Sequence, residues 1–405
     1  PAVLASVMFV DNHFGGSYYP AGSTLFLPGK LEKVIEEHNG DMYLESEVIE
    51  ILFDNHKPIG VLLNDGTKLY ANDIVYSGTV WRLYDTLLPK DETTQKERKW
   101  AESLVPTYPS VVFYTVVKKN VIPEDTLPIE MLVGNPDYLD ESEVTAYLLS
   151  IDDRTLCQDD EHIVIAIGPT FAKWDKENKA HYQEQKEAEI KRLTDVLERR
   201  FPGFGETIKY SELATPISLE RYLLKKDGAV AGPKQMLGQH LFKRLHIRSR
   251  WINLYCCGES TVMGTGTPTV TTSGLSAANA ILRKYKQEPF VYEPNRPNYV
   301  RFVEKPVHKD DLYQGYSEED KSIMLASMRC RFCEHPLCTQ YASTDVRGIM
   351  RRVAVGNFVG AKKCYAKAEA STRDLESFED NCINNIQSGS PVEIKRIIEY
   401  IVNEK

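Results

Sequence analysis

The sharpest change of hydrophobic pattern along the chain falls within residues 253–281. The segment begins as a short apolar run, breaks at Gly258-Glu259, crosses a loop rich in glycine, threonine and proline, and takes on helical spacing from Val270. This order predicts a strand, a loop and a buried helix. Glycine allows close backbone approach, a helix N-terminus favours an electron-rich group, and a carboxylate accepts hydrogen bonds from sugar hydroxyls. The pattern suits a cofactor site, although a tight connection in any α/β protein would show the same residues.

The first quarter of the chain shows both helical and strand periodicity. Residues 31–38 have helical spacing, and Asn39-Gly40 ends it with residue types that tolerate left-handed geometry. Residues 42–53 alternate as a strand, residues 58–64 form another, and residues 68–77 return after a turn. We predict a helix, a strand, a hairpin and a further strand.

The middle of the chain, about residues 106–250, is richer in strands. Residues 111–117 and 162–167 are rich in β-forming residues, while residues 182–200 form a charged amphipathic helix that ends before Pro202-Gly203. We predict a mostly antiparallel sheet with covering helices.

Composition narrows the classes of protein. With 405 residues, 42% of them hydrophobic and 26% charged, the chain is long enough for two or three domains with a large core. A formal net charge of −9 argues against a general nucleic-acid binder, because neutralising phosphates needs a basic surface. The sequence shows neither an apolar run of membrane-spanning length nor a recognisable signal peptide, so we expect a cytoplasmic protein.

Residues 253–281 resemble the C-terminal flavin-binding signature of the phytoene desaturase and carotenoid isomerase branch of the FAD-dependent amine-oxidase-like superfamily. Residues 15–22, Gly-Gly-Ser-Tyr-Tyr-Pro-Ala-Gly, resemble the stretch that leads from that family's substrate domain back to the flavin. The resemblance implies that the acid of the Gly-acid pair holds the ribityl chain and that the backbone of Val48 brackets the adenine. The FAD-binding residues it implies are Val48, Gly258, Glu259, Gly266, Thr267, Pro268, Thr269 and Val270.

The glycine fingerprint of a dinucleotide site, Gly-x-Gly-x-x-Gly in an opening βαβ unit, does not occur in this sequence. We therefore expect the nucleotide-binding segment of the FAD site to lie upstream on the same polypeptide or on another subunit. Tyr18, Tyr19 and Tyr222 are candidates for lining the substrate pocket, with ordinary core packing as the alternative.

Cysteines cluster near the end of the chain, after a proline-rich linker at about residues 288–318. Cys330, Cys333 and Cys338 follow one another at short spacing, which points to metal ligation rather than a disulfide framework. Spacing alone leaves three alternatives open: an iron–sulfur cluster, a zinc site with His335 available, or unligated thiols.

Residues 328–402 resemble the iron–sulfur module of the glutamate synthase small subunit and of dihydropyrimidine dehydrogenase. Those modules hold two clusters, but this chain has Ala342-Ser343 and residues 375–381 where the relatives place ligands of the second. The resemblance therefore implies one [4Fe–4S] cluster, held by Cys330, Cys333, Cys338 and Cys382. Cys364 is the reserve for the fourth ligand, and we expect Cys157, Cys256 and Cys257 to be structural.

The predicted fold class is α/β (α+β), with the later part of a Rossmann-like FAD domain, an antiparallel-sheet substrate domain and a small α-helical iron–sulfur domain. The predicted boundaries are 1–105 for the first FAD-domain part and the lead-in from the substrate domain, 106–250 for the substrate domain, 251–290 for the C-terminal FAD-binding segment, 291–318 for the linker and 319–405 for the helical [4Fe–4S] domain.

A flavin beside a cluster predicts an FAD-dependent oxidoreductase that adds or removes hydrogens across a carbon–carbon bond of an apolar or conjugated substrate. The alternatives are a reduced-flavin double-bond isomerase and an electron-transfer subunit of a larger complex. The sequence shows no catalytic acid or base. Cations between Arg347 and Lys367 offer a surface for an acidic carrier such as a ferredoxin or flavodoxin, or simply a solvated helix face.

Overall fold

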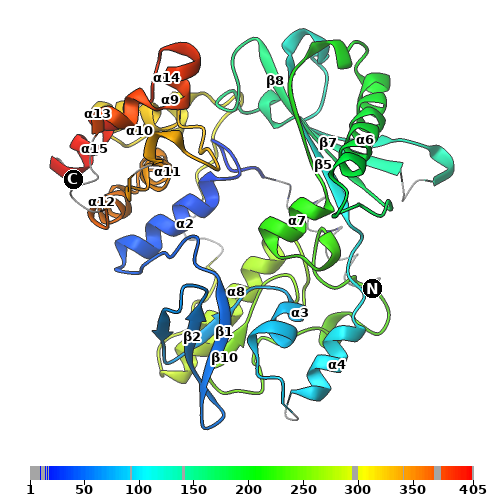
Figure 1. The fold of residues 1–405 in the computed structure, drawn as a ribbon, viewed down its shortest axis with the longest axis vertical. Coiled ribbons are helices and arrows are strands. Elements are labelled where there is room, and N and C mark those ends of the chain that lie inside the picture. The colour runs from blue at the N-terminus through cyan, green and yellow to red at the C-terminus, as the bar shows by residue number, and fades with distance from the viewer. Residues whose placement is uncertain are drawn as a thin grey trace. The chain divides into compact units, whose positions relative to one another are not determined.

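A computed structural model describes Val10, Phe14, Gly16 and residues 18–91, 94–138, 142–293, 300–340, 342–368 and 375–403. The chain forms two compact units (Figure 1). Unit 1 comprises residues 1–16, 45–149 and 159–301, and unit 2 comprises residues 17–44, 150–158 and 302–405. The apolar opening stretch of the sequence, apart from Val10, lies outside the described residues.

The first part of unit 1 contains two small sheets. β1 (Val48–Asp54), β2 (Lys57–Leu63) and β3 (Lys68–Tyr70) form an antiparallel sheet, in which Asn55 and His56 turn the chain with left-handed backbone angles. β4 (Ile74–Tyr76) instead pairs in parallel with β10 (Leu254–Cys256). This parallel pair brings the segment after the hairpin next to the segment that resembles the flavin-binding signature.

The predicted single strand over residues 68–77 is wrong, because the chain breaks into β3 and β4. Asn253 causes the break: its side-chain amide donates to the carbonyl of Asn72 at 3.2 Å, and its own carbonyl accepts from the amide of Ile74 at 2.8 Å. The chain therefore leaves the hairpin sheet and begins a new pairing with β10.

Helices pack around the parallel pair. They are α3 (Val80–Arg82), continued by the π-helical turn Leu83–Leu87, α4 (Gln95–Ser103) and α8 (Thr267–Lys284). Val80, Leu83, Leu254 and Cys256 belong to one buried apolar cluster. The predicted structural role of Cys256 agrees with its complete burial there.

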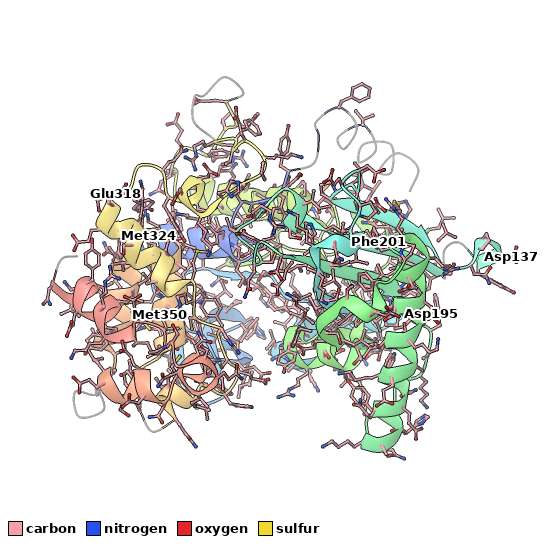
Figure 2. All side chains as sticks on the ribbon, turned by 90° about the horizontal axis from the view of Figure 1, so that it is seen from above. Asp137, Asp195, Phe201, Glu318, Met324 and Met350 are labelled. Carbon is pink, nitrogen blue, oxygen red and sulfur yellow. The ribbon has the colours of Figure 1, made fainter. Side chains whose placement is uncertain are left out.

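The second part of unit 1 is a five-stranded antiparallel sheet in the order β6-β7-β8-β5-β9. Its strands are β5 (Ser110–Lys118), β6 (Ile129–Val133), β7 (Glu143–Tyr147), β8 (Glu161–Pro169) and β9 (Ile208–Ala214). α6 (Lys179–Arg200), capped by the side chain of Asn178, lies beside this sheet (Figures 1 and 2), and α7 (Pro216–Leu223) follows β9. Alternate residues of β5, including Val111 and Phe113, are buried, which confirms the predicted antiparallel sheet with helical cover.

Unit 2 is mainly helical, as predicted for the C-terminal region. Its elements are α2 (Phe26–Glu37), α9 (Lys309–Leu312), α10 (Glu318–Ser327), α11 (Val346–Ala354), α12 (Phe358–Ala366), α13 (Leu375–Asp380), α14 (Ile383–Ser388) and α15 (Ile394–Asn403). Met324 and Met350, labelled in Figure 2, are fully buried, and Met350 shares an apolar cluster with Ile397 and Ile401. Among the described residues, no helix is both long and apolar enough to cross a bilayer.

The predicted helix at residues 31–38 forms as α2 but belongs to unit 2, whereas the sequence placed it with the FAD-domain part. The physical reason is a buried ion cluster. Glu32 and Glu36, one turn apart on α2, each lie 2.9 Å from the guanidinium of Arg352 on α11, and all three are at most 4% exposed. Asn357 also donates to Glu36, at 2.6 Å. The predicted domain boundaries remain a prediction, but these contacts tie α2 to the C-terminal helices.

Acid should weaken unit 2 through this cluster. Burial alone would raise the pKa of Glu36, but hydrogen bonds from Arg352 and Asn357 outweigh it and hold the pKa below its ordinary value of 4.5. A carboxylate with a lowered pKa contributes stability above its unfolded-state pKa and loses it as the pH falls through the folded-state pKa. We expect denaturant midpoints of the helical unit to be flat near pH 6–7 and to fall below about pH 4.5. A Glu36→Gln variant should show a smaller acid-dependent fall; an equal fall would contradict this role.

Candidate functional site

Unit 1 contains a cavity of about 730 Å³ where the ends of the parallel pair meet the hairpin sheet. Four predicted FAD-binding residues line it: Val48, Gly258, Glu259 and Val270. The other lining residues are Ser46, Glu47, Ile51, Val61, Ile74, Val75, Tyr76, Ser77, Gly78, Thr79, Arg82, Leu87, Leu223, Leu224 and Lys225. Positions far apart in the sequence thus converge on one site.

Gly258 ends β10 in a conformation that favours glycine. Its φ is +86°, and a Cβ there would lie 2.7 Å from the carbonyl oxygen of Ser77. Its amide donates to Ser273 Oγ of α8 at 2.8 Å. The chain therefore turns sharply after the strand and presents the next residue, Glu259, to the cavity.

Glu259 is held at both its side chain and its backbone. Its carboxylate pairs with the ammonium of Lys225, and its carbonyl accepts from Arg244 Nη2 at 2.6 Å. Arg244 also donates to the carbonyls of Pro233 and Thr261, and burial lowers the pKa of this arginine to about 10. Sequence reasoning missed both cations, because neither lies in a recognisable motif.

The N-terminus of α8 lies next to the same loop. Gly266, with φ +115°, precedes the helix, and Thr269 Oγ1 donates to its carbonyl at 2.8 Å. The helix begins at Thr267, three residues before the predicted start, and only Val270 of the predicted loop lines the cavity. Gly266, Thr267 and Pro268 are exposed at the helix start, so their predicted role in FAD binding stays a prediction.

The opposite part of the cavity has a second ion pair. Arg82 of α3 pairs with Glu47 and donates to the carbonyl of Val48 at 3.1 Å. Val48 is the residue whose backbone the family resemblance assigns to the adenine. The cavity thus offers a carboxylate and a glycine turn from β10 and a strand backbone from β1, which fits the donor and acceptor needs of a dinucleotide.

Substituting Gly258 with valine should abolish flavin binding. A β-branched residue would combine strain at φ +86° with a clash against the Ser77 carbonyl, costing about 1–2 kcal/mol for the backbone angle alone. We expect the flavin bound per polypeptide to fall at least about tenfold, since that cost corresponds to one decade. Gly274→Ala, where a Cβ would meet no atom within 4 Å, is the matched control and should retain flavin.

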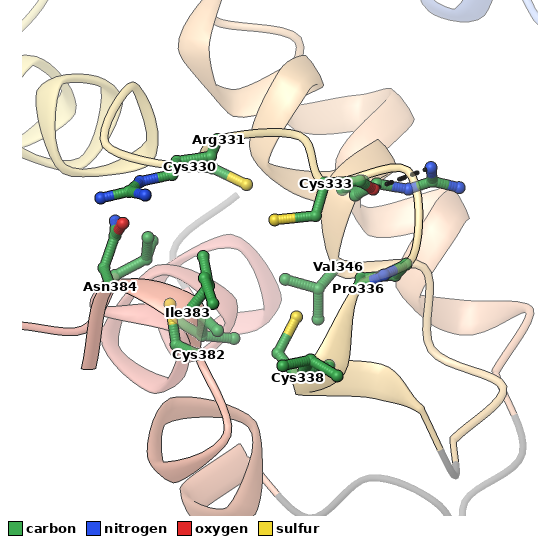
Figure 3. Close-up of a pocket in the computed structure, with 13 residues that line it drawn as sticks. Cys330, Arg331, Cys333, Pro336, Cys338, Val346, Cys382, Ile383 and Asn384 are labelled. Carbon is green, nitrogen blue, oxygen red and sulfur yellow. Dashed lines mark hydrogen bonds between the residues drawn. The ribbon is translucent and has the colours of Figure 1, made fainter. Parts of the chain in front are cut away.

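A second cavity, of about 30 Å³, lies in unit 2 and is lined by all four predicted cluster ligands, Cys330, Cys333, Cys338 and Cys382. Figure 3 shows their side chains around one space, with Val346 and Pro336 beside it. Arg347 of α11 donates to the carbonyl of Cys333 at 3.1 Å, which fixes the loop (Figure 3). The helical module therefore brings Cys382, some fifty positions away in sequence, to the other three thiols.

The four thiols line one cavity without forming a recognisable site for a single ion. In the part of the chain that the structure describes, no three cysteine, histidine or acidic side chains are close enough to share a single metal ion. Burial raises the pKa of Cys330 to about 11, and the other three thiols add to the shift. Cys330 is therefore a neutral thiol at pH 7, and any metal or cluster that bound it would displace its proton.

Cys364 does not line this cavity. Its sulfur lies 3.9 Å from the carbonyl oxygen of Asp345, and burial raises its pKa to about 11. Cys382 therefore has the better position for the fourth ligand.

Several cations of the segment between Arg347 and Lys367 make ion pairs or hydrogen bonds within unit 2. Arg351 and Arg352 pair with Glu32, and Lys363 donates to the carbonyl of Glu36 at 3.1 Å. Lys367 lies over the ring of Tyr43. Lys362 and Lys367 remain exposed, and the carrier surface stays a prediction.

The three candidate tyrosines do not line the cavity of unit 1 either. Tyr18 and Tyr222 are exposed, so core packing does not describe them, and their place in a substrate pocket stays a prediction. Tyr19 is half-buried in unit 2, where burial and the nearby charge of Asp153 raise its pKa to about 12. The amide of Gly22 donates to Asp153 at 2.7 Å, so this glycine-tyrosine segment is anchored within unit 2.

A family model described as flavin-containing amine oxidoreductase matches residues 2–282. The chain belongs to this family. Its mixed α/β fold with an antiparallel sheet is that of an FAD-dependent oxidoreductase, followed by a helical C-terminal region that the family match does not cover.

Curated relatives of this flavin-containing amine oxidoreductase include a prolycopene isomerase from Daucus carota, 26% identical over 287 residues, covering 69% of this chain and 46% of the relative. A neurosporene-forming phytoene desaturase from Cereibacter sphaeroides is 26% identical over 275 residues, covering 64% of this chain and 52% of the relative. The chain thus spans about half the length of the curated relatives it matches. A solved oxidoreductase from Methanosarcina mazei aligns over 67% of this chain and 58% of its own, with 16% identity and a TM-score of 0.48.

Proposed function

We propose that the protein is an FAD-dependent oxidoreductase that adds or removes hydrogens across a carbon–carbon bond of an apolar or conjugated, carotenoid-like substrate. One observation carries this proposal: Val48, Gly258, Glu259 and Val270 line a single cavity in a chain of the flavin-containing amine oxidoreductase family. The similarity to a prolycopene isomerase and a phytoene desaturase supports an apolar polyene as the substrate class.

The five-stranded sheet supports the same substrate class. On β5, Val112 and Val116 are partly exposed and Tyr114 is exposed, and their direct partners on β8 are Ile167, Ile163 and Ile165, all on one face. This apolar face of the sheet is opposite to the face formed by Val111 and Phe113. Glu212 of β9 lies opposite Tyr114 on this face, so the apolar part is the strip shared by β5 and β8, which suits an apolar partner.

FAD, once bound, supplies hydride acceptance and donation. The residues of this chain would bind and orient it: Glu259 would accept hydrogen bonds from the ribityl hydroxyls, and the backbone of Val48 would contact the adenine. None of the residues that line the cavity is placed as an acid or base with an open reaction partner, because Glu47 and Glu259 are both paired with cations. The opening nucleotide-binding segment is proposed to come from the same polypeptide or from another subunit.

The cysteine site is proposed to hold one [4Fe–4S] cluster through Cys330, Cys333, Cys338 and Cys382. The convergence of the four thiols on one cavity supports this ligand set. Such a cluster passes single electrons, so it would connect the flavin to a one-electron carrier of the ferredoxin or flavodoxin type. A cytoplasmic location is part of the same proposal.

Anaerobic turnover of the intact protein tests the reaction type. With a long conjugated polyene and excess oxidised acceptor, a desaturase forms one new double bond for every two electrons accepted. The second candidate, a reduced-flavin isomerase, is favoured by the prolycopene isomerase relatives and would convert geometric isomers with no net electron transfer. A protein with bound flavin that does neither would contradict both; a stoichiometric partner polypeptide carrying the active site would support the third candidate, an electron-transfer subunit.

A further inference from the structure

Lys225 reaches the cavity on a turn with unusual backbone angles. α7 ends at Leu223, and the next residue, Leu224, has left-handed angles of φ 53° and ψ 36°. Asp227 has φ 54° and ψ 27°. Such angles cost a residue other than glycine roughly 1 kcal/mol, so two within four residues mark a turn whose shape is imposed by its surroundings.

The same segment is fitted closely around Glu259. A Cβ on Gly228 would lie 2.4 Å from the carbonyl oxygen of Pro216, and a Cβ on Gly232 would lie 3.2 Å from Cγ of Glu259. Arg244 fixes the Glu259 carbonyl from the other direction. The turn and the Gly-acid pair are therefore built as one unit, with Lys225 and Glu259 facing each other.

The ion pair of Lys225 and Glu259 is shielded from solvent, and few cations line the cavity. The side chains of Lys225 and Glu259 are only 15% and 14% exposed. Among the described residues that line the cavity, the cations are Lys225 and Arg82, and Arg82 belongs to the Glu47 and Val48 end. Lys225 thus supplies the positive charge beside the carboxylate assigned to the ribityl chain.

We infer that Lys225 is a positioning residue for the flavin: it holds the Glu259 carboxylate toward the ribityl hydroxyls and balances the charge of that carboxylate within the flavin site. This inference rests on the proposed FAD site. A carboxylate that the ion pair already holds in one orientation loses less conformational entropy when it binds the hydroxyls. A flavin gains negative charge on reduction. Because Lys225 neutralises Glu259, its loss would leave an unpaired carboxylate near the flavin, which would disfavour the reduced form.

The test compares variants of the intact protein in two measurements, the Kd of FAD by fluorescence titration and the reduction potential by equilibration with a reference dye. Lys225→Met should weaken FAD about tenfold and shift the oxidised-to-reduced ratio about tenfold toward oxidised at a fixed dye potential. Lys225→Arg keeps the charge and should restore the potential. Lys225→Gln keeps a hydrogen-bond donor without charge, so FAD binding should largely recover while the potential stays low.

Lys226→Met is the matched control, because Lys226 lies over the ring of Trp81 and does not line the cavity. It should leave both quantities within about twofold, because neither Lys226 nor Trp81 lines the cavity. The inference is overturned if Lys225→Met or Lys225→Gln binds FAD and has the potential of the Lys226→Met protein. Failure of the unmodified protein to bind FAD would instead overturn the proposed function.

Discussion

Replacing Arg352 with methionine should lower the free energy of unfolding of the helical unit by about 3–5 kcal/mol, the usual result of removing one partner from a buried ion pair. Arg352 is 4% exposed and contacts two carboxylates, Glu32 and Glu36, which are 3% and 4% exposed. Without the guanidinium, two like charges would remain buried one helical turn apart. Urea unfolding followed by helical circular dichroism measures the change.

Arg396→Met is the matched control for Arg352→Met. Arg396 pairs with Glu393 at 2.7 Å on the surface of α15, with both side chains at least 43% exposed. Exposed pairs contribute about 0–1 kcal/mol, so this variant should unfold almost as the unmodified protein does. A loss below about 1 kcal/mol for Arg352→Met would contradict a stabilising role of the cluster, because it would lie within the range of a surface pair.

Substituting Cys333 with serine should remove the iron–sulfur cluster. Cys333 lines the cavity with three other thiols, and a [4Fe–4S] cluster needs all four thiolates as ligands of its iron atoms. We expect iron and acid-labile sulfide to fall to near zero after anaerobic reconstitution. The broad visible absorbance of the cluster should disappear with them.

Two further serine variants decide the fourth ligand. Cys382 lines the cavity, whereas Cys364 lies against Asp345 outside it. Cys382→Ser should therefore behave as Cys333→Ser, while Cys364→Ser should keep its iron. Retained iron in Cys382→Ser together with lost iron in Cys364→Ser would show that the ligand assignment is wrong.

Local sequence patterns predicted helices and strands well where the structure depends on the residues of the segment itself rather than on distant contacts. The β-forming residue types of 111–117 predicted β5, and the charged amphipathic run before Pro202 predicted α6. The Gly-acid break after residue 257 also located the end of β10. Gly258 has a φ of +86° and lies close to a carbonyl oxygen, and only glycine adopts this conformation without strain or a clash. The family resemblance, rather than the spacing, named Cys382 as the thiol that joins Cys330, Cys333 and Cys338 at one cavity.

Long-range contacts could not be read from such patterns. α2 carries the helical spacing expected of it, but its place in unit 2 depends on Arg352, more than three hundred residues away. The break between β3 and β4 depends on Asn253 in the same way. Lys225 was missed because a left-handed turn at Leu224, a residue that rarely adopts it, brings the side chain to Glu259. The sequence also did not reveal that Arg351 and Arg352 of the basic segment pair with the buried carboxylate of Glu32.

Flavin and iron content per polypeptide of the intact protein, purified and reconstituted without oxygen, tests the central claim most directly. A flavin site in unit 1 and one four-thiol cluster in unit 2 predict one FAD and about four iron atoms per polypeptide. About eight iron atoms would contradict the single-cluster assignment. A protein with neither flavin nor iron would contradict the proposed function as a whole.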